Sequence, residues 1–346
     1  MRQLPTRVAA TLPADSFSIV MATGIVSIAG YDTGYPLISY ALEMAGLTAF
    51  TVLLMLIGLR LSQHGPVLAG ALRSPTQIFG CYTFVAACDV LDARFLVGSA
   101  PPWLLVLLGV PALAGWLSLV PLTWRAMRSV SPRDLRTQAR GSWMLAAVGT
   151  QSLAIITTDF AMLEQSQALL GWAIAWWVLG MVVYLGTGAL IGWRIVAERI
   201  HPDDVTPDSW VLMGALAIAA LAGGTLLEAA QQPFAFDGLT QIMMPATMAV
   251  WICGSLWIPP LVAGEVWRAA RGSGVTRYDR ARWATVFPLG MYAVASHTLA
   301  RGWPGPMPSL LVVSQVFFWA ALVLWCVTSL GLLRLGLRRL HAGSTK

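Results

Sequence analysis

The stretch Trp283–Arg301, WATVFPLGMYAVASHTLAR, is long enough to cross a bilayer as a helix. It carries Pro288 directly after Phe287. Proline removes a backbone N–H donor and clashes with the preceding helical turn, so the sequence predicts a helix that bends just after Phe287. At about 100° per residue, one face of this helix presents Phe287, Met291, Val294 and Thr298. Two arrangements fit this pattern: Phe287 plugs a pore at the bend, or it packs against a neighbouring helix.

The composition places most of the chain in lipid. Residues are 57% hydrophobic and 11% charged, with a mean hydropathy of +0.69, whereas soluble domains have about 25% charged residues. The four cysteines lie in apolar stretches without metal-ligand spacing, and no HExxH, GxSxG or glycine-rich phosphate loop occurs. The sequence therefore predicts an all-α membrane protein that is not an enzyme and has no catalytic residues, metal or cofactor.

Ten apolar segments can be marked, each near the length of about 20 residues that a spanning helix needs. Residues 1–346 are expected to form a single transmembrane domain. Because the residues before Asp15 lack an apolar core, the first segment is interpreted as a retained helix and not as a signal peptide. The expected inner helices are 15–31, 76–98, 141–160, 209–230 and 283–302, and the expected outer helices are 36–60, 102–124, 167–193, 239–267 and 308–333.

The arginines predict the orientation of the chain. Apart from Arg94 and Arg301, they lie in the N-terminal tail or after the second, fourth, sixth, eighth and tenth segments. By the positive-inside rule, both termini are cytoplasmic and the number of spans is even. The expected location is the inner (plasma) membrane of a bacterium.

The odd and even segments differ in their chemistry. Odd segments begin near an aromatic residue and carry most of the polar side chains, while even segments are bulkier and more uniformly apolar. The repeat therefore predicts five helical hairpins, with even helices facing lipid and odd helices lining a pore. The predicted pore-lining residues are Thr23, Ser27, Thr83, Thr150, Gln151, Ser152, Thr225, Met291, Val294 and Thr298.

Four of the odd segments resemble the tellurite-resistance/dicarboxylate transporter family, which includes plant slow-type anion channels and fungal malate and sulfite transporters. The stretches are FSIVMATGIVSIAG at 17–30, GSWMLAAVGTQSLAI at 141–155, WVLMGALAIAALAG at 210–223 and WATVFPLGMYAVAS at 283–296. The resemblance covers nearly the whole chain. It implies ten helices with pseudo-fivefold symmetry around a central pore, a homotrimer, and a gate at Phe287 beside Pro288.

Two ionisable residues depart from the largely uncharged pores of the related channels. Asp89 lies well inside the third segment, and His297 lies inside the ninth. Ionisable residues at membrane depth are candidates for function, here for proton coupling. The alternatives are that Asp89 or Asp92 pairs with Arg94, and that His297 bonds a backbone carbonyl.

The leading functional hypothesis is passage of small anions through the pore, with a C4-dicarboxylate such as malate or an inorganic anion as substrate. Hydroxyl and amide donors can hold a partly dehydrated anion without trapping it. The alternative is a proton-coupled carrier of dicarboxylate, or an efflux carrier of sulfite or tellurite-related anions. A membrane-embedded enzyme and a receptor or scaffold are remote alternatives. The expected partners are the anion, the lipid bilayer and further copies of the chain, and no nucleic acid.

Overall fold

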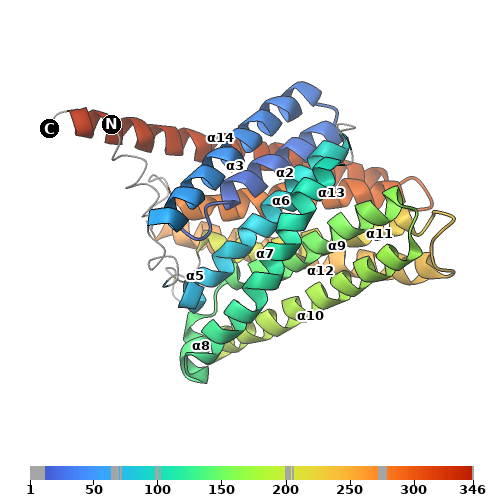
Figure 1. The fold of residues 1–346 in the computed structure, drawn as a ribbon, viewed down its shortest axis with the longest axis horizontal. Coiled ribbons are helices and arrows are strands. Elements are labelled where there is room, and N and C mark those ends of the chain that lie inside the picture. Colours follow the sequence, from blue (N-terminus) through green and yellow to red (C-terminus); the bar gives the residue numbers. More distant parts are fainter. Residues whose placement is uncertain are drawn as a thin grey trace.

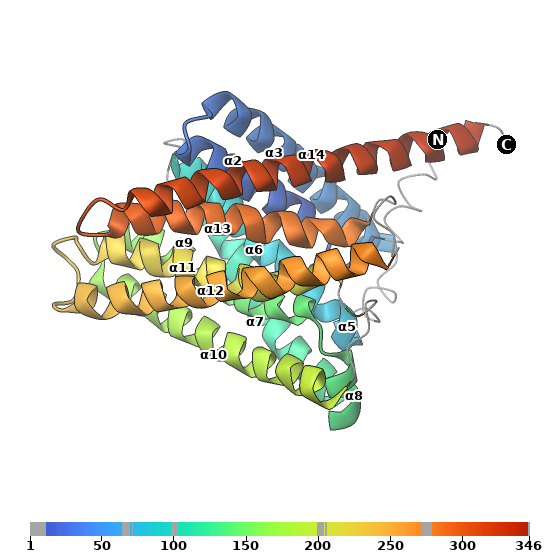
Figure 2. The same cartoon turned by 180° about the vertical axis from the view of Figure 1, so that it is seen from behind.

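The computed structural model describes residues 12–63, 70, 72–97, 101, 103–198, 204, 206–271 and 279–344, without the side chains of 339–344. The two views of the ribbon show long helices lying side by side (Figures 1 and 2). No β-strand occurs within these residues. The predicted all-α class is therefore confirmed for the described part of the chain.

Five inner helices form a closed ring. Each packs against the next, and α13 packs against α2 to complete the circle. Their cores are largely buried: in the inner segments Gly141–Leu163 and Pro207–Ala229, 89% and 94% of the most apolar stretch is buried. The inner helices are α2 Ser18–Asp32, α6 Tyr82–Val97, α9 Leu145–Leu163, α11 Val211–Ala229 and α13 Trp283–Gly302.

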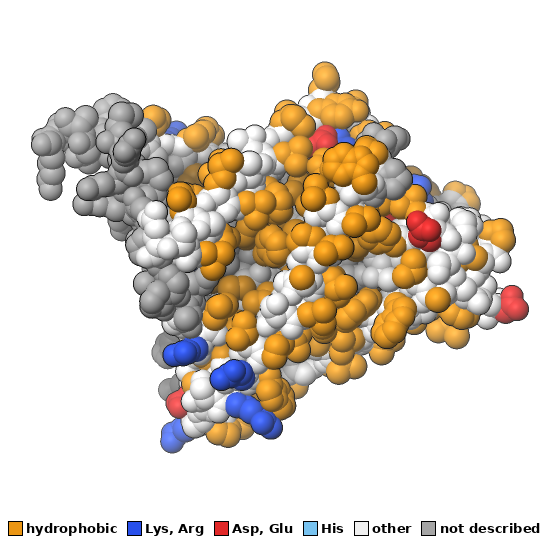
Figure 3. All heavy atoms as spheres, viewed as in Figure 1, with side chains coloured by type: hydrophobic (Ala, Val, Ile, Leu, Met, Phe, Trp, Pro, Cys, Tyr) orange, Lys and Arg blue, Asp and Glu red, His pale blue; other side chains and the backbone are white. Residues whose placement is uncertain are grey.

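Each inner helix is followed by a longer outer helix that packs against it and also contacts the next inner helix of the ring. The outer surface of these helices is apolar, as the hydrophobic side chains covering the body of the molecule show (Figure 3). Exposed leucine, valine and tryptophan side chains suit a surface in contact with lipid. The outer helices are α3 Pro36–Gln63, α7 Trp103–Arg128, α10 Gln167–Ala197, α12 Leu239–Ala270 and α14 Pro308–Ser344.

Short helical turns precede four of the inner helices. The 3-10 turns η1 Phe79–Cys81, η2 Gly141–Met144, η4 Pro207–Trp210 and η5 Arg280–Arg282 run directly into α6, α9, α11 and α13. The short helices α5 Pro75–Ile78 and α8 Pro132–Gln138 lie at the same end. We call this end, where α3, α7, α10 and α12 finish, the arginine-rich end. Figure 3 shows arginine side chains, in blue, gathered at its α8 corner.

Seven helices in the described residues are long and apolar enough to cross a membrane. These are the five outer helices and the segments that contain α9 and α11. The other three predicted spans are the inner helices α2, α6 and α13. Helix α2 has 15 residues, or about 22 Å at 1.5 Å per residue, and α6 and α13 carry charged residues. A helix enclosed by protein does not need the length or apolarity of a lipid-facing one. The count of ten spans stays a prediction.

Glycine permits the closest approaches in the ring. A Cβ atom at position 290 of α13 would lie 2.8 Å from Ile25 Cγ2 of α2, and one at position 214 of α11 would lie 2.7 Å from Pro288 Cγ. Both distances are shorter than van der Waals contact between carbons, so neither site has room for a larger residue. Small residues are the usual way in which membrane helices come close together. Here they bring α2 and α11 against both sides of α13.

Indole N–H groups connect four outer helices to the ring. In each case the tryptophan donates to the inner helix of the next hairpin, and α14 donates back to α2. The bonds are Trp116 to Thr150 Oγ1 (2.9 Å), Trp177 to the Ala219 carbonyl (2.9 Å), Trp251 to Ser296 Oγ (3.0 Å) and Trp325 to Thr23 Oγ1 (2.9 Å). The ring is therefore joined to its outer layer by directional bonds as well as by packing.

Candidate functional site

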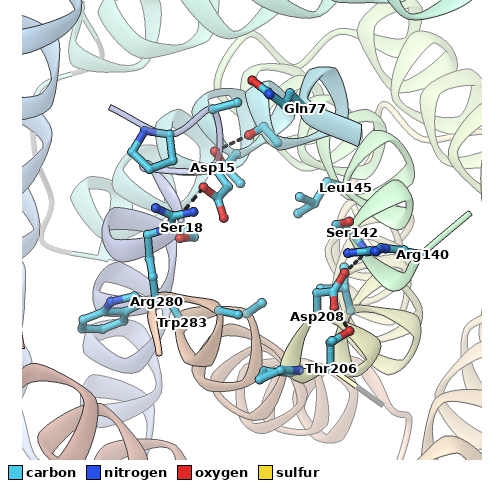
Figure 4. Close-up of a pocket in the computed structure, with 18 of the residues that line it drawn as sticks. Asp15, Ser18, Gln77, Arg140, Ser142, Leu145, Thr206, Asp208, Arg280 and Trp283 are labelled. Carbon is cyan, nitrogen blue, oxygen red and sulfur yellow. Dashed lines mark hydrogen bonds and ion pairs between the residues drawn. The ribbon is translucent and has the colours of Figure 1, made fainter. Parts of the chain in front are cut away.

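A cavity of about 710 Å³ opens at the arginine-rich end, and we call it the vestibule. It is enclosed by the beginnings of all five inner helices, as the close-up in Figure 4 shows. Asp15, Ser18 and Arg280 lie on one wall, and Arg140, Ser142 and Asp208 lie on the opposite wall. The full lining is Leu12, Pro13, Ala14, Asp15, Ser18, Met21, Arg60, Thr76, Gln77, Gly80, Thr83, Arg140, Ser142, Trp143, Leu145, Thr206, Pro207, Asp208, Val211, Asp279, Arg280, Ala281, Trp283, Ala284 and Phe287.

The inner helices share one polarity, so their N-termini converge on the vestibule. The first turns of a helix have backbone N–H groups without partners in the helix, and the helix dipole places partial positive charge there. Several such ends around one cavity create a positive potential that suits anions.

Buried aromatic rings fix the start of each inner helix. Phe79 stacks on Trp143, with ring centroids 4.7 Å apart, and both side chains are buried. This pair joins the starts of two neighbouring inner helices, since Phe79 lies just before α6 and Trp143 just before α9. Such rings also explain the aromatic residue repeated at the beginning of the odd segments: Phe17, Phe79, Trp143, Trp210 and Trp283 are all buried.

The acidic residues of the vestibule are engaged by the protein itself. Asp15 pairs with Arg280, with Oδ1 3.5 Å from Nε. Asp208 accepts a hydrogen bond from the backbone N–H of Ser142 (3.1 Å), and Asp279 accepts one from that of Ala281 (2.9 Å). Carboxylates used in this way organise the helix starts, and they offset the formal charge of the lining arginines Arg60, Arg140 and Arg280.

The vestibule ends at Phe287. The deepest lining residues on the five helices are Met21, Thr83, Leu145, Val211 and Phe287. Phe287 is only 1% exposed, and the helix continues unbroken through Pro288, whose ring contacts α11 at Gly214. The bulky ring therefore stands at the inner limit of the cavity.

The predicted pore-lining residues divide by what they contact. Thr83 lines the vestibule and donates to the Gly80 carbonyl (2.6 Å). By contrast, Thr23 and Thr150 accept the indole bonds of outer helices, and Gln151 Nε2 donates to the Trp177 carbonyl (3.1 Å). These three side chains therefore contact the outer layer.

The remaining predicted residues lie deeper in the ring. Ser27 donates to the Ser39 carbonyl (2.7 Å) of α3 and accepts from Arg94, and Thr225 donates within its own helix to Ala222 (2.9 Å). The remaining three members of the α13 face are Met291 and Val294, which are buried, and Thr298, which lies against Gly224. Ser152 is buried, with Asp89 of α6 as a polar neighbour.

The carboxylates of α6 do not pair with Arg94, so that expectation is wrong. The Arg94 guanidinium is fully buried and binds Glu43 of α3, with Nη2 2.9 Å from Oε2. Within the described part of the chain, Asp89 Oδ1 and both oxygens of Asp92 are buried without hydrogen-bond partners. Asp159 of α9 is the charged neighbour of both. The described residues offer His297 no hydrogen bond, and its side chain is half-buried.

Three functional candidates were missed from the sequence. Asp159 lies inside the polar stretch of the fifth segment, and its position at membrane depth was a usable signal. Glu43 and Arg60 lie near the ends of one outer segment, where charged residues are ordinary, so no signal distinguished them. Among the described residues, no group of His, Cys, Asp and Glu is arranged to hold a metal ion.

Comparison with known proteins agrees with a helical membrane protein. The family model of SLAC1, described as a voltage-dependent anion channel, matches residues 11–333. Two uncharacterized membrane proteins of Mycobacterium tuberculosis, from strains CDC 1551 and H37Rv, are each 35% identical over 153 residues. That match covers 44% of this chain and 76% of each relative. Because the family model spans nearly the whole sequence, the chain belongs to the SLAC1 family of voltage-dependent anion channels, a family of membrane transporters.

Proposed function

We propose that the protein passes small anions through the centre of the inner ring, and that Phe287, held by Pro288, gates this path. The single observation that carries the proposal is the vestibule: five helix N-termini converge on a cavity whose inner limit is the Phe287 ring. By the positive-inside rule, the arginine-rich end faces the cytoplasm, with both termini on that side. The proposed assembly has ten spanning helices in five hairpins per chain, and three chains.

The chemistry of the vestibule suits conduction. Backbone N–H groups, hydroxyls and arginines attract an anion, while the nearby carboxylates of Asp15, Asp208 and Asp279 limit how tightly it is held. Conduction requires binding that is favourable enough for entry and weak enough for exit. On α13 the lining of the cavity stops at Phe287. The side chain of Phe287 must therefore move aside before an anion can pass from the vestibule into the ring.

The test is passive anion flux in liposomes. Phe287→Ala removes the ring at the inner limit of the vestibule, so we expect it to raise chloride and malate flux above that of the wild type. Phe318→Ala is the matched control, because Phe318 is equally buried but lies on α14, outside the vestibule. Equal flux in Phe287→Ala and wild type, with normal folding, would refute the gate.

A second candidate function is proton-coupled transport, and the buried carboxylates favour it. Among the described residues, Asp92 and the Oδ1 atom of Asp89 are buried without hydrogen-bond partners near Asp159, and Glu228 of α11 is the next acidic neighbour of Asp159. A fixed group of carboxylates opposes passage of an anion unless protons accompany it. Labelled malate uptake driven by a pH gradient, without measurable current, would favour this carrier over the channel.

A C4-dicarboxylate such as malate is the substrate that we propose first, because the sequence resembles the dicarboxylate-transporting branch. Chloride, nitrate, sulfite and tellurite-related anions are the alternatives within the same mechanism. Competition of each anion with labelled malate in the liposome assay ranks them directly.

A further inference from the structure

Arg60 is unlike most arginines at its end of the molecule. It lies in the last turn of the outer helix α3, yet its side chain turns inward and is 7% exposed. Among the described residues, only Arg60 and Arg94 are buried arginines. Arg94 has Glu43 as its counter-ion, whereas Arg60 has no carboxylate within ion-pair distance in the described part of the chain.

One edge of the Arg60 guanidinium meets no hydrogen-bond acceptor within the described residues. Its Nη1 donates to the carbonyl of Leu12, just before α2, while the buried Nε has no hydrogen-bond partner among the described residues. The described residues offer Nη2 no partner either. Nε–H and one N–H of Nη2 point in parallel from the same edge of the planar group, which is the geometry that binds two oxygens at once.

That group belongs to the wall of the vestibule. The three carboxylates that also line the cavity already have partners: Asp15 binds Arg280, Asp208 binds the Ser142 N–H and Asp279 binds the Ala281 N–H. Burying a charge without a partner is costly. An anion entering the vestibule would remove that cost, and the N-terminus of α2 adds to the attraction.

We propose that Arg60 forms an oxyanion-binding site in the vestibule, in which Nε and Nη2 hold two oxygens of a carboxylate or of a trigonal inorganic oxyanion. A halide offers no pair of oxygens to this edge, so the site prefers oxyanions to chloride. The role of the site in loading the transport path rests on the proposed function. The binding itself does not, because it can be measured without transport.

The test is ligand-dependent thermal stability of the purified full chain in detergent. Chloride is replaced by nitrate in one series and by malate in another, at constant ionic strength. We expect saturable stabilisation of the wild type by both. Arg60→Gln should bind at least about 10-fold more weakly, since a charged hydrogen bond contributes about 1.5–3 kcal/mol. Arg60→Lys keeps the charge and a donor towards Leu12, but should lose the preference over chloride.

Arg128→Gln is the matched control. Arg128 lies at the same end, is exposed and stacks on Trp124 at 4.5 Å, outside the vestibule. Its removal should leave anion binding unchanged. Wild-type binding in Arg60→Gln, or equal stabilisation of the wild type by chloride and nitrate, would overturn the site. If Arg60→Gln fails to fold, the loss of oxyanion preference in Arg60→Lys decides instead.

The outcomes also separate this site from the proposed gate. Intact binding in Arg60→Gln together with raised flux in Phe287→Ala would refute the site alone. Loss of anion binding in Arg60→Gln, together with unchanged flux in Phe287→Ala, would refute the gate and support the site.

Discussion

Replacing Gly214 with alanine tests the contact that holds the proposed gate in place. Gly214 of α11 faces Pro288, and an added Cβ would lie 2.7 Å from the proline Cγ and 3.0 Å from its Cβ. Carbon atoms normally stay about 3.5–4.0 Å apart. The rigid proline ring has no rotamer that avoids the methyl group, so α11 and α13 must separate by roughly 1 Å to restore this spacing.

The expected effect is a loss of stability. Overpacking of this kind costs about 1–3 kcal/mol, against a gain of about 0.5–1 kcal/mol when alanine replaces glycine inside a helix. Gly186→Ala provides the comparison, because Gly186 lies within α10 and an added Cβ would meet no atom within 4 Å. Both variants gain the same stabilisation from placing alanine in a helix. The difference between their unfolding free energies is therefore the steric cost at Gly214, about 1–3 kcal/mol.

Equilibrium unfolding in mixed micelles, with an increasing fraction of sodium dodecyl sulfate, measures this difference through tryptophan fluorescence. Gly214→Ala should unfold at a lower fraction than wild type, while Gly186→Ala should match wild type or exceed it. If the two variants shift the midpoint equally, the close packing of α11 against Pro288 does not exist and the reasoning fails.

Two further predictions concern charged groups inside the ring. Glu43→Gln leaves the buried Arg94 guanidinium without a counter-ion, so we expect the same unfolding assay to report a loss of about 3–5 kcal/mol in stability. Glu265→Gln is the control: it breaks the more exposed pair with Arg268 and should change stability by at most about 1 kcal/mol. Equal losses in the two variants would contradict Glu43 as the counter-ion of Arg94. If transport is proton-coupled, Asp89→Asn should abolish malate uptake driven by a pH gradient, because Asp89 is buried beside Asp92 and Asp159 without a hydrogen-bond partner for Oδ1. Asp237→Asn, on an exposed loop, should retain the gradient dependence, and a retained dependence in Asp89→Asn would remove that residue from coupling.

The sequence predicted where helices lie better than it predicted which way their side chains point. Hydropathy predicts the all-α membrane fold because the chain has too few polar residues for any other solvent. It does not show where a polar side chain on an inner helix points, since a helix enclosed on all sides finds partners in every direction. Thr23 and Thr150, predicted to line a pore, accept hydrogen bonds from outer tryptophans, which no local pattern indicates.

Charged residues show the same limit. An arginine near the end of a membrane helix fits the positive-inside rule whether its side chain points to water or into the protein. The inward turn of Arg60, and the pairing of Arg94 with Glu43, depend on how α3 packs beside α2 and α6. Those long-range contacts are absent from any local pattern. Phe287 was found from the sequence because a proline directly follows it, and it does line the vestibule.

The bond between Trp325 and Thr23 has a consequence for biosynthesis. Each of the other three indole bonds joins a helix to the next hairpin made by the ribosome, but this one joins α14 to α2, the first helix of the ring. Helix α2 must therefore enter the membrane long before its last neighbours exist. The inner ring can close only when α13 reaches α2, and α14 then covers this junction from outside. A chain that loses α14 would therefore keep all five inner helices, but the contact between α13 and α2 would lack its outer cover and the bond to Thr23.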